Sequence, residues 1–149
     1  GKLKDGFTPF KADDWFWAQA VAHNGSVIAA SLSGTIYALD AESGAKQWQA
    51  EAGGSIRGTP AIVNNRIVVG TDEGSDKGRV YCYDADTLEL LWQYPSAGVD
   101  PMYSIHASIG SYGDVVYVHT TNQKIYAFNV EQAGTEARYL WTISTGGGE

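Results

Sequence analysis

The sequence feature that most constrains the fold of this 149-residue chain is a motif that occurs three times. Each copy places a tyrosine in a short apolar stretch, an Asp or Asn three residues later, then a turn and a tryptophan. In chain order these are Tyr37, Asp40 and Trp48; Tyr81, Asp84 and Trp92; and Tyr126, Asn129 and Trp141. A period of about 45 residues built from short strands is typical of propeller blades.

The local chemistry of the motif favours strands joined by tight turns. In 35–40, Ile36 and Ala38 alternate with Tyr37 and Leu39, over a span too short for a helix. The carboxylate of Asp40 can accept hydrogen bonds from backbone amides two residues on, and Gly44 can take the positive φ of such a turn. We expect all three tryptophans to be buried at equivalent places between neighbouring sheets, with the three tyrosines also at these contacts.

Applied to the whole chain, the pattern predicts an all-β fold with three four-stranded antiparallel blades and almost no helix. We assign residues 1–14 to a leader or outer strand, 15–54 to the first blade, 55–98 to the second and 99–149 to the third. The predicted strands are 15–22, 27–31, 35–40 and 46–51; 59–63, 67–71, 79–84 and 89–94; and 105–109, 115–120, 124–129 and 138–144.

The motif resembles the repeat of pyrroloquinoline-quinone (PQQ)-type β-propellers. The first copy, SLSGTIYALDAESGAKQW, matches that repeat almost in full. The second, GRVYCYDADTLELLW, has Leu88 where glycine is usual, and the third, QKIYAFNVEQAGTEARYLW, has Asn129 and a longer turn. WD-type and kelch-type signatures do not recur. The resemblance implies a PQQ-type propeller and a secreted or periplasmic location.

Three blades are fewer than the four to eight that close a propeller ring. Either the chain belongs to a larger propeller or other chains complete it. We therefore expect a protein partner or further blades, and self-association through open apolar blade faces. If the chain is a monomer, the leader 1–14 is the segment expected to cover one of these faces.

Composition excludes several other classes. The formal net charge is −7 and the lysines and arginines are scattered, which argues against a nucleic-acid surface. No apolar run approaches the length of a transmembrane helix. Cys82 is the single cysteine, so no internal disulfide can form.

Two groups of residues are candidate binding sites. The segments that enter the innermost strands share one rim of a propeller, and there we place Trp17, Arg57, Tyr103 and His106, which could bind an anionic or aromatic ligand. The alternative is that Trp17 packs between blades and Arg57 pairs with an acid.

The second group is the acidic loop of the middle blade. Asp72, Glu73 and Asp76 supply oxygen atoms suited to Ca²⁺, but they lack the regular spacing of an EF-hand loop. A solvated acidic hairpin is the alternative.

The sequence contains no nucleophile motif and no phosphate-binding glycine loop. In the quinoprotein alcohol dehydrogenases that share the repeat, the resemblance implies PQQ beneath a disulfide of adjacent cysteines, beside a calcium. One cysteine cannot supply that disulfide. We therefore expect no enzymatic activity, no PQQ and no calcium.

The expected role is a non-catalytic binding or scaffolding platform, similar to the propeller lipoprotein that assists outer-membrane barrel assembly. The alternatives are a fragment of a PQQ-dependent dehydrogenase whose cofactor residues lie in other blades, and a structural subunit that polymerises.

Overall fold

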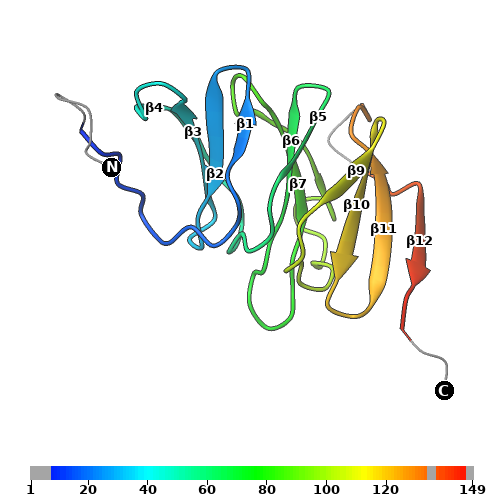
Figure 1. Ribbon diagram of the computed structural model, residues 1–149. Helices are drawn as coiled ribbons and strands as arrows, with labels where there is room; N and C mark the ends of the chain where they lie inside the picture. Colours follow the sequence, from blue (N-terminus) through cyan, green and yellow to red (C-terminus); the bar gives the residue numbers. More distant parts are fainter. Residues whose placement is uncertain (1–7, 134–136, 147–149) are drawn as a thin grey trace.

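The computed structural model describes residues 8–133 and 137–146, and in these ranges the chain is all-β. Three four-stranded antiparallel sheets stand side by side in chain order, with the first and last described residues at opposite sides of the array (Figure 1). No described segment is a helix that could span a membrane. The strands are β1 (Val21–His23), β2 (Ser26–Ala30), β3 (Thr35–Asp40) and β4 (Lys46–Glu51); β5 (Ala61–Val63), β6 (Arg66–Gly70), β7 (Val80–Asp84) and β8 (Leu90–Tyr94); and β9 (Gly110–Tyr112), β10 (Val115–Thr120), β11 (Lys124–Asn129) and β12 (Trp141–Ser144).

Each sheet is a blade in which consecutive strands pair, and the three blades form an open array. The expected fold, a partial propeller of three four-stranded blades, is therefore confirmed. The second and third strands of each blade lie close to their predicted bounds, because alternating apolar residues specify which face is buried.

The innermost strands differ from the prediction. The range 105–109 is not a strand, and the inner strand of the third blade is β9. The predicted strands 15–22 and 59–63 are likewise reduced to β1 and β5. The reason is clearest at Ile56 and Ile105, whose amides donate to the Ser31 and Thr71 carbonyls of the preceding blade. Both isoleucines are fully buried at blade junctions, so these apolar segments connect blades and do not extend a sheet.

The turn after each third strand has the predicted chemistry. One carboxylate oxygen of Asp40 accepts the Ser43 amide at 2.7 Å, and Asp84 accepts the Thr87 amide at 3.0 Å in the same way. Gly44 has φ +69°, and Leu88 at the corresponding position of the second blade adopts φ +56°. Burial of the Leu88 side chain in the junction with the first blade accompanies this conformation, which is unusual for a residue other than glycine.

Two apolar cores lie between the blades. The first is formed by Ile28, Ile36 and Ala38 of the first blade against Tyr81 and Tyr83 of the second. The second core brings the following residues of the second and third blades together: Val80, Cys82, Trp92, Val116, Val118 and Phe128, with Tyr126 partly buried against them. Tyr81 and Tyr126 thus face the preceding blade.

The motif tryptophans are not equivalent, which corrects the prediction that all three are buried. Trp92 is 2% exposed and its indole nitrogen donates to the Val130 carbonyl at 3.0 Å. Trp48 is 51% exposed, and at that junction Tyr83 donates its hydroxyl to the Glu51 carbonyl and is buried together with Leu88.

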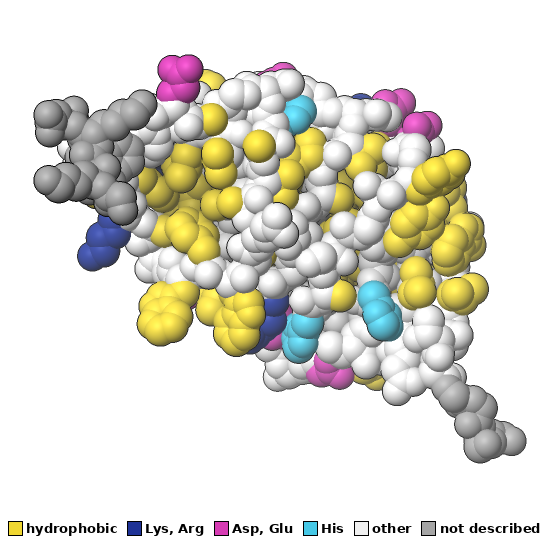
Figure 2. Space-filling model, viewed as in Figure 1, with side chains coloured by type: hydrophobic (Ala, Val, Ile, Leu, Met, Phe, Trp, Pro, Cys, Tyr) yellow, Lys and Arg dark blue, Asp and Glu magenta, His cyan; other side chains and the backbone are white. Residues whose placement is uncertain are grey.

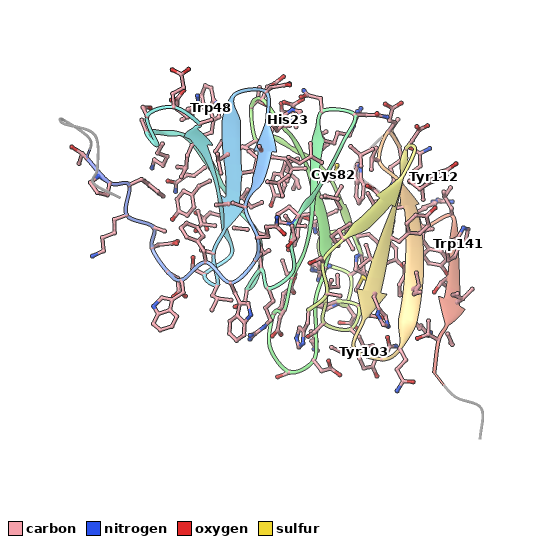
Figure 3. All side chains as sticks on the ribbon, in the orientation of Figure 1. His23, Trp48, Cys82, Tyr103, Tyr112 and Trp141 are labelled. Atoms are coloured by element: carbon pink, nitrogen blue, oxygen red, sulfur yellow. The ribbon has the colours of Figure 1, made fainter. Side chains whose placement is uncertain are left out.

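Trp141 is 43% exposed on the outer face of the third blade, where no described blade follows. Figure 3 places Trp48 on the first blade and Trp141 and Tyr112 on the third. Tyr117 is the one aromatic ring against Trp141 in the described chain, at a centroid distance of 5.9 Å. The burial of Trp141 therefore depends on what lies beyond this face of the third blade.

The described part of the leader, residues 8–14, packs on the outer face of the first blade. The Phe10 ring lies 4.8 Å from the Tyr37 ring, and the Tyr37 hydroxyl accepts the Asp13 amide. The Asp13 carboxylate accepts hydrogen bonds from the hydroxyls of Ser33 and Thr35. Desolvation acts to raise the pKa of Asp13, but these hydrogen bonds outweigh it and hold the pKa well below its ordinary value.

The opposite end of the array is uncovered within the described residues. Its exposed side chains include Tyr112, Trp141 and Ile143. In the space-filling view, hydrophobic side chains gather at this end, on the right of Figure 2. The two ends of the array are therefore unlike: residues 8–14 pack on one end, and the other end presents an apolar sheet face.

Candidate functional site

Three of the four predicted rim residues occupy the same position in consecutive blades. In every blade an amide after the second strand donates to the segment that enters the innermost strand. These bonds run from Leu32 to Trp15, from Asp72 to Ser55 and from Thr121 to Ser104. Trp17, Arg57 and His106 each come two residues after the acceptor, so each blade contributes one of them to the same rim. Figure 2 shows aromatic, basic and histidine side chains side by side along this lower edge.

Asp72 is the residue that draws Arg57 and His106 together. Its Oδ2 atom lies 3.0 Å from Arg57 Nε and 3.3 Å from His106 Nε2. Its Oδ1 atom accepts from the Ser104 hydroxyl at 3.1 Å and from the Gly74 amide at 3.0 Å. The side chain of Asp72 is only 15% exposed, so this carboxylate links the second and third blades from a largely enclosed position.

The surroundings of Asp72 favour its ionised form. Desolvation acts to raise the pKa of this carboxyl, whereas hydrogen bonds from Gly74, Arg57 and Ser104 and the positive charge of Arg57 act to lower it. The second group of effects is larger, and the pKa of Asp72 lies below its ordinary value. The ionised carboxylate is therefore the form that holds the cluster together.

Trp17 completes the cluster from the first blade. The guanidinium carbon of Arg57 lies 5.7 Å from the centre of the Trp17 ring, within the range of a cation–π contact. The indole remains 68% exposed. Trp17 therefore does not pack between blades. Arg57 does pair with an acid, as the alternative reading expected.

Tyr103 does not join this cluster. It lines a separate cleft between the second and third blades, together with Met102 and Tyr126. Sequence reasoning missed this cleft, which is bordered by the long segment 95–103 that links the two blades. The length of that segment, compared with the short Ala52–Gly54 link of the preceding junction, is the sequence signal that could have indicated it.

The acidic loop does not gather its carboxylates. Asp72 serves the rim cluster, Glu73 pairs with Arg79 at 3.5 Å, and Asp76 accepts a hydrogen bond from Thr121. In the described ranges, no group of three or more His, Cys, Asp or Glu side chains is arranged to hold a metal ion. The hairpin is therefore part of the packing between blades two and three.

The fold and the rim define the class of protein: an open segment of a β-propeller with PQQ-type repeats, carrying an aromatic and charged cluster at one rim. The family model described as "Outer membrane protein assembly factor BamB" (PQQ_2) matches residues 10–139. The chain belongs to this family, and its predicted membership of the PQQ-type propellers is confirmed.

Relatives of two kinds share parts of the sequence. The chain is 34% identical over 84 residues to the lanthanide-dependent methanol dehydrogenase of Methylacidiphilum fumariolicum, an alignment that covers 52% of this chain and 14% of the relative. It is 37% identical over 62 residues to the outer membrane protein assembly factor BamB of Shewanella oneidensis, covering 42% of this chain and 15% of the relative. The matched regions thus span about one seventh of each relative.

The crystal structure of BamB from Moraxella catarrhalis has the same arrangement of blades. It superimposes with a TM-score of 0.72 at 24% identity, covering 92% of this chain and 37% of that structure. At this level of identity the likeness concerns the fold.

The described residues do not fit the quinone and calcium site that the family's dehydrogenases imply. Cys82 is fully buried in the core between blades two and three, where burial raises the pKa of its thiol to about 12. Calcium takes six to eight oxygen ligands. The rim cluster contributes the carboxylate of Asp72, and that carboxylate already contacts Arg57 and His106.

Proposed function

We propose that this chain is a non-catalytic segment of an extracytoplasmic propeller whose rim binds a polypeptide partner. The observation that carries the proposal is the exposed aromatic surface beside Arg57. Trp15 and Trp17 are 81% and 68% exposed at the rim, and Arg57 stacks on Trp17. Tryptophan and arginine are the residue types most enriched among the residues that dominate protein–protein binding energies.

The internal pairing of the rim supports binding rather than catalysis. A general base or nucleophile must have an atom free to react with a substrate in a pocket. Both carboxylate oxygens of Asp72 are instead engaged by Arg57, His106, Ser104 and a backbone amide. These contacts fix Arg57 in place beneath the Trp17 ring. A rigid, pre-organised surface of this kind lowers the entropic cost of binding.

The relatives suggest the class of partner. The name of the Shewanella relative describes an assembly factor for outer membrane proteins. We therefore propose an unfolded outer-membrane protein, or a component that handles it, as the polypeptide bound at the rim. This function places the chain outside the cytoplasm and requires neither PQQ nor calcium.

The test is the binding of a fluorescently labelled, urea-unfolded outer-membrane barrel protein, diluted into buffer and followed by anisotropy. Replacing both Trp17 and Arg57 by alanine should weaken binding roughly a hundredfold, the effect of losing two central contact residues. Lys46→Ala, an exposed residue of β4, is the matched control and should bind like the wild type. Equal affinity of the double variant and the wild type would refute a rim-centred site.

The second candidate function is a fragment of a PQQ-dependent dehydrogenase. The observation in its favour is the 34% identity to the methanol dehydrogenase over 84 residues. Titration with PQQ and Ca²⁺, followed by tryptophan fluorescence, separates the two functions. A binding platform should give no saturable quenching at micromolar PQQ, whereas saturable quenching would favour the dehydrogenase.

A further inference from the structure

The junction between blades two and three contains a cleft of about 470 Å³, and the link between the blades is longer there than at the junction between blades one and two. At the first junction, Ala50 pairs with Ile36, and Ser55 follows five positions later. At the second, Tyr94 takes the place of Ala50, and the equivalent serine, Ser104, follows ten positions later. The second link is therefore longer.

The short link passes close over the motif tyrosine of the second blade at the first junction. A Cβ atom on Gly53 would lie 2.3 Å from the Tyr81 hydroxyl, so the backbone passes directly over this tyrosine. Tyr126 is the equivalent residue at the second junction, and it lines the open cleft. The cleft thus lies where a tyrosine that is covered at one junction is left accessible at the next.

Arg79 anchors the long link, residues 95–103. Its guanidinium donates to the Pro95, Ser96 and Val99 carbonyls at 2.9, 3.1 and 2.6 Å. Gly78 adds a backbone bond to Met102 at 2.8 Å. The Arg79 side chain is largely buried and is also paired with Glu73. The walls of the cleft are therefore fixed by hydrogen bonds, as in a pre-formed binding site.

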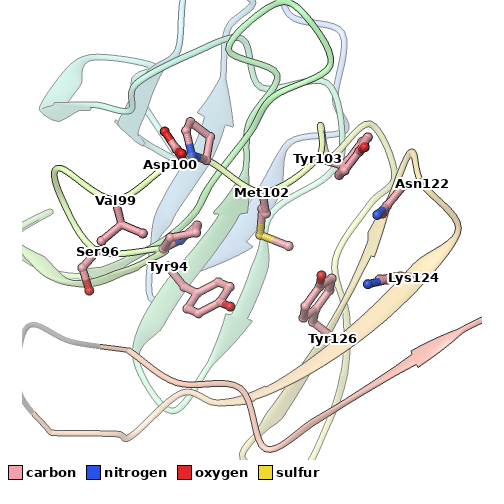
Figure 4. A pocket seen from close by; sticks show the side chains of 11 residues that line it. Tyr94, Ser96, Val99, Asp100, Met102, Tyr103, Asn122, Lys124 and Tyr126 are labelled. Atoms are coloured by element: carbon pink, nitrogen blue, oxygen red, sulfur yellow. The ribbon is translucent and has the colours of Figure 1, made fainter.

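The interior of the cleft is aromatic and apolar, and its mouth is charged. Figure 4 shows Met102 at the centre, between the rings of Tyr94 and Tyr126, with Lys124 on one side and Asp100 on the other. In the described part of the chain, the Lys124 ammonium has no acidic side chain within ion-pair distance. Among the described residues it is therefore available to an anionic group of a ligand.

We infer that this cleft binds an aromatic side chain of a polypeptide segment whose neighbouring residue is acidic. The aromatic ring would lie against Tyr94, Met102 and Tyr126, because offset and edge-to-face contacts between rings are favourable. The adjacent carboxylate would pair with Lys124. Asp100 on the opposite side disfavours the reversed orientation. The inference rests on the proposed polypeptide-binding function and names the chemistry of one bound segment.

The experiment uses three fluorescein-labelled hexapeptides that contain Asp-Phe, Ala-Phe or Lys-Phe at their centre, with anisotropy as the readout. The Asp-Phe peptide should bind most tightly. Lys124→Glu should weaken its binding roughly tenfold and reverse the order of the Asp-Phe and Lys-Phe peptides. Lys46→Glu, the same charge change on the first blade, is the control and should leave the order unchanged.

A second variant tests the aromatic part of the cleft. Tyr103 is half-exposed at its edge, so Tyr103→Ala should weaken all three peptides without affecting folding, which circular dichroism checks. No binding of the Asp-Phe peptide, or an order of affinities that Lys124→Glu does not change, would overturn the inference. If the unfolded barrel protein still binds through Trp17 and Arg57, that outcome would leave the proposed function standing.

Discussion

Truncation of Trp92 should be among the most destabilising substitutions in this chain. The indole is almost fully buried, and its ring stacks on Phe128 at a centroid distance of 5.8 Å. Removing roughly 200 Å² of buried surface at about 25 cal/mol per Å² corresponds to about 5 kcal/mol. Partial collapse of the cavity reduces this cost, so we expect Trp92→Ala to lower the free energy of unfolding by about 3–5 kcal/mol.

Two further variants separate the contribution of the indole hydrogen bond from that of the buried ring. Trp92→Phe keeps an aromatic ring but leaves the Val130 carbonyl without the indole donor, which should cost about 1–3 kcal/mol. Trp48→Ala changes the same motif position in the first blade, where the indole is half-exposed. We expect it to cost about 1–2 kcal/mol, because only about half as much surface is buried there.

The assay is urea denaturation followed by far-ultraviolet circular dichroism, with the slope of the transition compared among the variants. A change in midpoint at constant slope would report stability alone. If Trp92→Ala and Trp48→Ala cost the same within about 0.5 kcal/mol, the reasoning from burial at the second junction would be refuted. The position in the motif, and not the packing of the blades, would then determine the contribution of the tryptophan.

Two other predictions concern the rim and the open face. The lowered pKa of Asp72 means that its contribution to stability is complete above about pH 4, the ordinary pKa of an unfolded Asp, and is lost as the pH falls through the lower pKa of the folded state. Asp72→Asn should therefore cost about 1–2 kcal/mol at pH 7, and the difference in melting temperature from the wild type should shrink below pH 4; a difference independent of pH would contradict this. The wild-type chain should self-associate at micromolar concentration through the outer face of the third blade, since residues 8–14 pack on the other end. Light scattering should show the monomer mass for a variant with Trp141→Lys and Ile143→Lys, and a wild type that stays monomeric at all concentrations would argue against this interface.

Much of the candidate site could be placed from the sequence, but its chemistry could not. When the first two blades are aligned on their second strands, Trp17 and Arg57 fall at equivalent positions. The structure shows that His106 occupies the same position in the third blade. The contact that joins Arg57 to His106 is made by Asp72, which reads in the sequence as one acid of a loop. Its role depends on how two blades approach each other, and no local pattern reports that distance.

The sequence by itself determined the elements that depend on near neighbours in the chain. The turns at Asp40 and Asp84 form because a carboxylate reaches amides two and three residues away, and strands β3, β10 and β11 follow from alternating side chains. Only the tertiary structure decided what each blade face meets. One motif position is buried at Trp92 and half-exposed at Trp48 and Trp141, because burial depends on the side chains of the opposing blade and not on the motif itself.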